Sequence, residues 1–256
     1  MTELSLKSVP ILLTSSVIPH DQNVRLNDPK ARLHHAIESV AAWQGIKPEA
    51  PLVLCDGSGF NFEPIIRPLF PAADIEYLHF DNNEASVAQY GRGFGEGEII
   101  RHAIFNSTRI NSAGCFTKCS SKLWVENYSK FESQWNGTML FNGVFNNAIK
   151  PFSKCTISYI DTRFYIINTN VYRELLINAH YEINKLKKFS LENAFLNILL
   201  RNNLMNYLTN IPPIISGVGG TIGKYYKNSN RRYLKDQIRI FFAKRNDLYK
   251  NLFIIK

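Results

Sequence analysis

Short apolar runs that end in small polar residues mark the first third of the chain. Val9 to Val17, VPILLTSSV, is the first, Ala50 to Phe60, APLVLCDGSGF, is the second, and Asp74 to Asp81, DIEYLHFD, is the third. Apolar runs of this length, bounded by turn residues, are typical of strands buried inside a parallel sheet. The sequence therefore predicts three strands, the first two ending in Thr, Ser, Asp and Gly.

A helical pattern separates the first two strands. In the segment from Asp28 to Gly45, Asp28 can cap the helix and Pro29 suits its first position. The apolar stripe of this helix consists of Leu33, Ile37, Val40 and Ala41. Strand, helix and strand in this order predict an α/β fold with a Rossmann-like, mostly parallel central sheet flanked by helices. Because such sheets bind ligands at the carboxyl ends of their strands, we expect the site near Thr14 and Asp56.

Alternate glycines at positions 91, 93, 95 and 97 come before a helix that we predict from Glu96 to Phe105. Each glycine costs roughly 0.5–1 kcal/mol relative to alanine inside a regular element, so we expect a loop here. Bare backbone before a helix N-terminus suits an anion or a sugar beside one. The spacing is neither GxGxxG nor a P-loop, and Glu96 and Glu98 favour contacts with sugar hydroxyls. A flexible surface loop is the alternative.

Further strands are predicted within residues 115–127, 137–145 and 155–168, with Asp161 in the middle of the last segment. Two helices, at about 169–187 and 190–207, follow them. The main domain is expected to end near Gly223.

The net charge of +9 is concentrated at one end of the chain. Residues 224–256 hold ten Lys and Arg against two Asp, so this segment carries +8 and residues 1–223 are nearly neutral. A neutral main domain argues against nucleic acid as a ligand, because proteins that bind a phosphate backbone carry a broad basic face. We therefore divide the chain into a main domain, 1–223, and a basic C-terminal segment, 224–256.

The C-terminal segment also has an apolar pattern. Its stripe on one predicted helical side consists of Leu234, Ile238, Phe241, Phe242, Tyr249, Leu252 and Phe253. A basic amphipathic helix suits an anionic membrane surface, and packing of the stripe on the main domain is the alternative. The sequence has no apolar run of the about 18 residues that a membrane span needs, and its start lacks a secretory signal pattern. We expect a cytoplasmic protein that is peripheral on the inner membrane.

The order of several motifs resembles bacterial glycosyltransferases of the GT-A fold that build O-antigen or capsular polysaccharide. The motifs are ILLTSS, RLHHAIESVAAW, LCDGSGF, GRGFGEGEIIRHAIFNS, FTKCSSKLW and DTRFYIIN, and they extend over residues 9–223. The resemblance implies a nucleotide-sugar donor at the ends of the first strands. It also implies a glycan or lipid-linked acceptor on the C-terminal half.

The resemblance further implies which residues meet the donor. Thr14 and Ser15 would lie beside the nucleotide, and Asp56 would accept a hydrogen bond from the base or ribose, with a plain turn residue as the alternative. Arg101, on the helix after the glycines, would contact the donor. Ser58 and Gly59 would shape the same pocket. From the residues themselves we also expect donor contacts at Gly93, Gly95, Glu96, Lys118, Lys122 and Arg163.

The chain departs from the Asp-x-Asp metal motif of many GT-A enzymes. At its expected place FTKCSSKLW offers Lys118 and Lys122, which could neutralise the leaving diphosphate directly; two solvated lysines are the alternative. In Asp161-Thr162-Arg163, arginine takes the place of the second carboxylate. We therefore assign no metal ligands or other cofactor and expect transfer without a divalent ion. Adjacent His34 and His35 are predicted to be ordinary helix surface.

An inverting transfer needs a base for the acceptor hydroxyl, and Asp161 and Glu192 are the candidates. A carboxylate that complements the helix N-terminus is the alternative for Glu192. Two other functions compete with glycosyl transfer. A sugar-phosphate nucleotidyltransferase usually has a Gly-rich loop with Lys after its first strand, and LLTSSVIPHD contains no glycine. A non-catalytic protein would use the basic segment to bind membrane or nucleic acid.

Overall fold

The computed structural model describes residues 8–20, 24–148, 154–220, 223–226 and 230–255. Its strands are β1 (Ile11–Ser15), β2 (Leu52–Asp56), β3 (Ile75–His79), β4 (Cys115–Ser120), β5 (Leu123–Val125), β6 (Met139–Leu140), β7 (Gly143–Asn146), β8 (Thr156–Ile160), β9 (Phe164–Asn168), β10 (Ile215–Gly219) and β11 (Lys224–Tyr225). Its α-helices are α1 (Pro29–Ile46), α2 (Glu63–Leu69), α3 (Glu84–Tyr90), α4 (Arg92–Asn106), α5 (Thr108–Ala113), α6 (Tyr128–Glu132), α7 (Thr169–Val171), α8 (Leu191–Arg201) and α9 (Asn230–Lys244). Short π or 3₁₀ turns are η1 (Tyr172–Leu176), η2 (Ala179–Glu182) and η3 (Lys250–Leu252).

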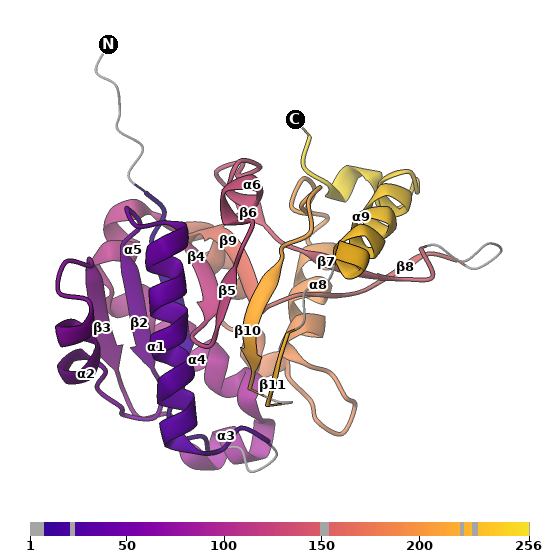
Figure 1. Cartoon of the computed structure of the whole chain (residues 1–256). Coiled ribbons are helices and arrows are strands. Elements are labelled where there is room, and N and C mark those ends of the chain that lie inside the picture. Colours follow the sequence, from indigo (N-terminus) through magenta and orange to yellow (C-terminus); the bar gives the residue numbers. More distant parts are fainter. Residues whose placement is uncertain (1–7, 21–23, 149–153, 221–222, 227–229, 256) are drawn as a thin grey trace.

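The central sheet has the order β3-β2-β1-β4-β9-β6 (Figure 1). Strands β3, β2, β1 and β4 pair in parallel, and β9 pairs antiparallel with both β4 and β6. The predicted α/β class and the mostly parallel sheet are confirmed. The chain leaves β1 toward β2 on one side and later adds β4 on the other side, so the switch point of the sheet lies between β1 and β4.

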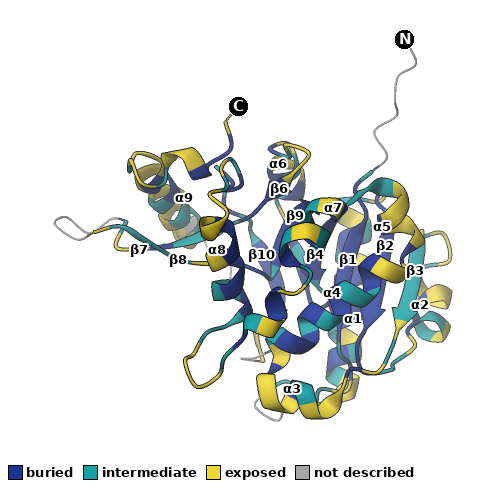
Figure 2. Cartoon of the chain, turned by 180° about the vertical axis from the view of Figure 1, so that it is seen from behind, coloured by how far each residue is buried: buried dark blue, intermediate teal, exposed yellow. Residues whose placement is uncertain are grey.

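The two faces of the sheet are covered by different helices. Ile11 and Leu13 of β1 pack in one core cluster with Trp43 of α1, and Leu12 packs in the other with Ile100 of α4. This alternation follows from the two-residue period of a strand. Figure 1 shows α1 across the front of the sheet, and α4 is seen on the other face in Figure 2.

Three of the four alternate glycines, at positions 93, 95 and 97, lie inside helix α4, which begins at Arg92, so the predicted loop and the predicted helix start at Glu96 are wrong. Gly91 precedes the helix with a φ of 92°, a left-handed conformation that favours glycine. The other three glycines allow close contact with α3, η2 and α8. A Cβ on Gly97 would overlap His180, and a Cβ on Gly93 would lie 3.1 Å from Ile183 Cδ1. Close helix packing, rather than an anion-binding loop, therefore accounts for the bare backbone.

The helices in the second half of the chain are shorter and more interrupted than the sequence pattern predicts. The expected helix at about 169–187 is divided into α7, η1 and η2, and the expected helix at 190–207 ends at Arg201. The break places His180 beneath Gly97 of α4, where its side chain is buried. Residues 155–168 form two strands, β8 and β9, and Asp161 begins the turn between them.

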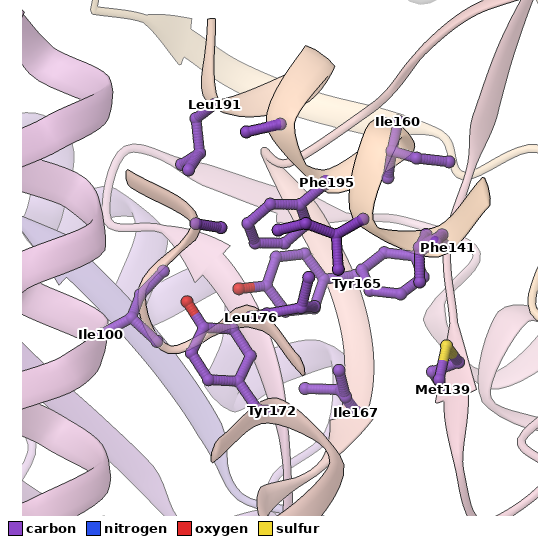
Figure 3. Packing of buried hydrophobic residues seen from close by; sticks show 14 of the residues in the cluster. Ile100, Met139, Phe141, Ile160, Tyr165, Ile167, Tyr172, Leu176, Leu191 and Phe195 are labelled. Atoms are coloured by element: carbon purple, nitrogen blue, oxygen red, sulfur yellow. The ribbon is translucent and has the colours of Figure 1, made fainter. Parts of the chain in front are cut away.

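An aromatic cluster fixes α8 against the sheet (Figure 3). The ring of Tyr165 on β9 lies 5.8 Å from that of Phe195 on α8 and 5.1 Å from that of Phe141, measured between centroids. All three side chains are fully buried. This packing holds the first turn of α8, and with it Glu192, at a fixed place beside the sheet.

The C-terminal segment does not form one amphipathic helix. Helix α9 ends at Lys244, and Leu252 and Phe253 belong to the larger core cluster, with Phe253 stacked on Phe145. The predicted single stripe is therefore wrong: its distal half is core, while Leu234, Ile238, Phe241 and Phe242 of α9 are exposed. Strand β11, at the start of the segment, pairs with β10.

Candidate functional site

A cavity of about 420 Å³ lies at the carboxyl ends of β1 and β4, which is the switch point of the sheet. Elements from the whole length of the chain surround it, including the loop between β8 and β9, the first turn of α8 and the end of β10. Its lining includes Thr14, Ser15, Ser16, His20, Arg32, Asn82, Arg92, Gly95, Glu96, Ser120, Lys122, Thr162, Arg163, Glu192, Gly219, Gly220 and Tyr226.

Two basic side chains converge beside Gly220. A Cβ on this glycine would lie 4.0 Å from Lys122 Nζ and 3.9 Å from Arg32 Nη1. Arg32 is oriented by hydrogen bonds that it donates to the carbonyl oxygens of Ser16 (2.6 Å) and Leu26 (2.8 Å). Both side chains are buried, with about 7% of each residue exposed. This arrangement leaves a space bordered by two cationic groups.

Lys122 carries the less compensated of these two charges. Its ammonium donates no hydrogen bond to the other described residues. Burial, together with nearby Arg32 and Lys118 and against the attraction of Asp56, lowers its pKa to about 7. Burial also lowers the pKa of Arg32 to about 10, against the attraction of Asp56. A buried ammonium without a partner is costly, and an anion in the cavity would relieve that cost.

Glu96 reaches the cavity from α4 and is held from below by Lys118. The Lys118 ammonium is fully buried, forms an ion pair with the Glu96 carboxylate, and donates to the carbonyl oxygen of Thr162 at 2.8 Å. Burial lowers the pKa of Lys118 to about 8 in spite of nearby Asp161 and Glu192. Lys118 therefore fixes a cavity carboxylate and does not itself line the cavity.

Arg163 and Tyr226 form a wall between this cavity and a smaller one of about 60 Å³. Arg163 donates to both carboxylate oxygens of Asp161, at 2.8 and 2.5 Å, and its guanidinium lies 5.1 Å from the centre of the Tyr226 ring. Burial alone would raise the pKa of Asp161, but Arg163 more than offsets it, and the pKa lies below its usual value. Asp161 lines the smaller cavity, and its role in this structure is to hold Arg163.

Asp56 organises the loops at the end of β2. It accepts hydrogen bonds from the backbone N–H of Val17 (2.9 Å) and from both the backbone N–H (2.7 Å) and the hydroxyl (2.6 Å) of Ser58. The whole residue is fully buried and does not line the cavity. The Ser58 hydroxyl in turn accepts from the backbone N–H of Ile18 at 3.0 Å. Asp56 and Ser58 thus shape the loop that follows β1.

The cavity brings together some of the predicted site residues and leaves others out. Those that line it are Thr14, Ser15, Gly95, Glu96, Lys122, Arg163 and Glu192. Those that do not are Asp56, Ser58, Gly59, Gly93, Arg101, Lys118 and Asp161. Arg101 lies more than two turns into α4, because the helix begins at Arg92, and it donates to the Tyr181 hydroxyl at 2.8 Å.

Sequence reasoning missed Arg32, Arg92, His20, Gly220 and Tyr226. Arg32 could have been recognised from the sequence, because it lies one turn before Ala36 on the buried side of α1. Arginine is rarely buried unless its charge has a partner. Gly220 and Tyr226 stand in a segment without a clear pattern, and only the pairing of β10 brings them to the cavity.

No family model matches the chain, and no curated protein matches its sequence. Solved structures do resemble it. The inositol-1-phosphate CTP transferase from T. maritima aligns with a TM-score of 0.51 at 9% identity, over 91% of this chain and 96% of that one. An active-site mutant of LgtC aligns with a TM-score of 0.49 at 8% identity, over 90% and 83%. The bifunctional glycosyltransferase WbbM aligns with a TM-score of 0.47 at 11% identity, over 93% of this chain and 45% of that one. The first of these shows that the chain shares the α/β fold of that enzyme.

Within the described part of the chain, no helix is both long and apolar enough to span a bilayer.

Proposed function

We propose that this protein is a glycosyltransferase that moves a sugar from a nucleotide-sugar donor to a lipid-linked acceptor in bacterial surface polysaccharide assembly. The observation that carries the proposal is the cavity at the switch point, which combines two carboxylates with a buried ammonium that has no partner among the described residues. Cations suit the diphosphate of the donor, and carboxylates suit the hydroxyls of its sugar. The general rule that open α/β sheets bind ligands at their switch points supports a nucleotide at this place.

The donor would lie with its diphosphate between Lys122 and Arg32. Two positive groups beside Gly220 offer charge and space for phosphate oxygens, and the nucleoside would extend toward Thr14 and Ser15 at the end of β1. Glu96, held by Lys118, would accept hydrogen bonds from sugar hydroxyls. The charge of Lys122 becomes favourable once the diphosphate is bound, because charge-assisted hydrogen bonds are among the strongest.

In the transfer step, the acceptor oxygen forms a bond to the anomeric carbon while the bond from that carbon to the diphosphate oxygen breaks. The electron pair of the broken bond stays on the diphosphate, where Lys122 and Arg32 stabilise the developing charge. The acceptor proton goes to a carboxylate, for an inverting reaction. Glu192 suits this role better than Asp161, because Glu192 lines the cavity while both oxygens of Asp161 bind Arg163.

A lipid-linked acceptor would be met at a membrane surface, and helix α9 offers a way to reach it. Its exposed face carries Leu234, Ile238, Phe241 and Phe242, with Arg231, Lys235, Lys244 and Arg245 also exposed. Figure 1 shows α9 at the edge of the molecule, where it lies beside β7. We therefore extend the proposal to peripheral binding of α9 to an anionic bilayer.

Nucleotidyl transfer is the second candidate function. The structural similarity to an inositol-1-phosphate CTP transferase favours it at the level of the fold, and the cationic groups of the cavity would also suit a triphosphate. The run after β1 has no Gly-rich loop with lysine, which speaks against it. The two reactions yield different products, so one assay separates them.

The test incubates the protein with UDP-, GDP- and CMP-sugars and, separately, with nucleoside triphosphates plus sugar 1-phosphates. Glycosyl transfer predicts release of nucleoside diphosphate or monophosphate from one sugar donor, and no pyrophosphate from any triphosphate. Pyrophosphate release would establish the second candidate instead.

Because Lys122 and Arg32 stand where a metal would otherwise neutralise the diphosphate, turnover is expected to persist in excess EDTA. Loss of turnover that Mn²⁺ restores would mean that a carboxylate holds a metal.

A further inference from the structure

Outside the cavity, three side chains of helix α1 bring potential metal-ligand atoms together. The imidazole nitrogens of His34 and His35 and a carboxylate oxygen of Glu38 all lie within 4.8 Å of one another. We propose that His34, His35 and Glu38 form a surface binding site for a transition-metal ion of the Zn²⁺ class. The site is independent of the proposed transfer reaction, because none of the three residues lines the cavity.

The helix itself explains how two adjacent histidines can share a ligand set. Neighbouring residues on a helix are separated by about 100°, so His34 and His35 alone would diverge. Glu38 lies one turn further on, roughly 40° from His34 and 60° from His35 about the axis, and thus stands between them. His35 Nδ1 is 2.6 Å and His34 Nε2 is 3.5 Å from separate Glu38 oxygens.

These distances are close to what a metal requires. Three ligands on a tetrahedral ion, each about 2.1 Å from it, lie about 3.4 Å from one another. To bind the ion, His35 Nδ1 and the Glu38 oxygen would have to move from 2.6 Å to about 3.4 Å apart, which needs only a small side-chain movement. Two of the three side chains are partly or largely exposed, so solvent leaves room for this movement. His34 is 68% exposed and Glu38 is 34% exposed, while His35, at 15%, is the more fixed ligand. Water would complete the coordination.

A residue from a distant part of the chain orients the carboxylate. The hydroxyl of Tyr225, on β11, donates to both oxygens of Glu38, at 3.1 and 2.9 Å. Outer-shell hydrogen bonds of this kind orient metal ligands and raise metal affinity.

The donor set indicates which metals fit. Two imidazoles and one carboxylate suit Zn²⁺, Ni²⁺ and Cu²⁺ better than Mg²⁺ or Ca²⁺, which prefer oxygen ligands. Zn²⁺ is the probe of choice because it has no redox chemistry and accepts tetrahedral N and O ligands.

The experiment titrates Zn²⁺ into the full chain, free of any affinity tag and of metal, at pH 7.5 against a chromophoric chelator. The expected result is one equivalent of bound Zn²⁺ that a His34→Asn, His35→Asn double variant loses. The control is a His79→Asn, His102→Asn double variant, which removes a second neighbouring histidine pair, on β3 and α4, and is expected to bind as the parent does. Thermal unfolding without metal checks that each variant is folded.

A third variant tests the geometry. Tyr225→Phe is expected to weaken Zn²⁺ binding by about 10-fold, the lower end of the range for loss of an outer-shell partner. Tyr233→Phe is the matched control and is expected to have no effect. Equal Zn²⁺ stoichiometry and affinity in the parent and the His34→Asn, His35→Asn variant would overturn the proposal. The same conclusion would follow if the control pair accounted for the binding. Neither outcome bears on nucleotide binding, so the proposed function is tested separately.

Discussion

At the scale of single residues, the proposed binding of the donor diphosphate depends most on Lys122. We predict that Lys122→Met weakens binding of the donor nucleotide by about 1.5–3 kcal/mol, or roughly 10- to 150-fold, because a charge-assisted hydrogen bond is lost. The same change should leave the thermal stability of the ligand-free protein equal or higher, since it removes a buried ammonium that lacks a partner among the described residues. Calorimetric titration and a thermal melt measure the two effects. Lys130→Met, at an exposed position of α6, is the control; a parallel loss there would contradict the assignment.

The lowered pKa of Lys122 also predicts a pH dependence. Burial places this pKa at about 7 in the folded chain, against an ordinary value of 10.5. The ammonium of the ligand-free protein therefore loses its proton as the pH rises through 7, and donor binding at pH 8 should take up a proton. Between about pH 7 and 10.5, Lys122 is neutral in the folded chain and charged in the unfolded chain. The contribution of this group to the free energy of unfolding therefore rises with pH over this range, as the cost of burying its charge is relieved. Titration at pH 8 in buffers of different ionisation enthalpy measures the uptake, which Lys122→Met should abolish.

At the scale of the elements, α4 depends on the absence of a side chain at Gly97. A methyl group there would overlap the ring and Cβ of buried His180, and overpacking of this kind costs about 1–3 kcal/mol. We predict that Gly97→Ala destabilises the protein in urea unfolding. Gly45→Ala, in α1, meets nothing within 4 Å and should stabilise it by about 0.5–1 kcal/mol through helix propensity alone. If both substitutions stabilised the protein, the packing account of the glycines would fail.

Helix α9 provides the second prediction at this scale. The full chain should bind vesicles that contain anionic lipid, more weakly as salt rises, because each basic residue near the surface contributes about 1 kcal/mol. Phe241→Ser with Phe242→Ser should reduce vesicle binding without loss of stability, since both side chains are exposed. Deleting the whole segment is a poor test, because Leu252 and Phe253 are core residues. Unchanged co-sedimentation of the double variant would contradict the role of α9.

At the scale of the whole molecule, local pattern predicted the parallel strands better than it predicted the positions of individual side chains, and the structure has a cavity at the strand ends where the site is expected. The strands β1 and β2 are continuous apolar runs bounded by turn residues, so the sheet and its carboxyl edge could be predicted from the sequence alone. Asp56 could not be distinguished from a ligand-binding residue, because an Asp before Gly-Ser-Gly at a strand end suits either role. Three of its four hydrogen bonds come from Ser58 and Phe60 in the loop after β2, and the fourth comes from Val17 after β1. The glycines of α4 misled because part of their close packing is with residues far away in the sequence: His180, which Gly97 contacts, lies 83 positions after it.

The pairing of Lys118 with Glu96 is another long-range effect. The two lysines of FTKCSSKLW look equivalent in the sequence, yet Lys118 is neutralised by Glu96 from α4 while Lys122 faces the cavity without a partner among the described residues. One lysine thus positions a carboxylate, and the other faces the cavity, where we propose that it binds the donor diphosphate. This difference arises where β4 and α4 meet, and no local pattern records it.

The central claim is that the cavity at the carboxyl ends of β1 and β4 holds the donor. The most direct test is a crystal structure of the protein soaked with the nucleotide sugar that titration identifies. The account predicts density for the diphosphate within hydrogen-bond distance of Lys122 Nζ and Arg32, beside Gly220, with the nucleoside next to Thr14 and Ser15 and the sugar facing Glu96 and Glu192. Ordered nucleotide elsewhere on the molecule, with this cavity empty at a saturating concentration, would contradict it.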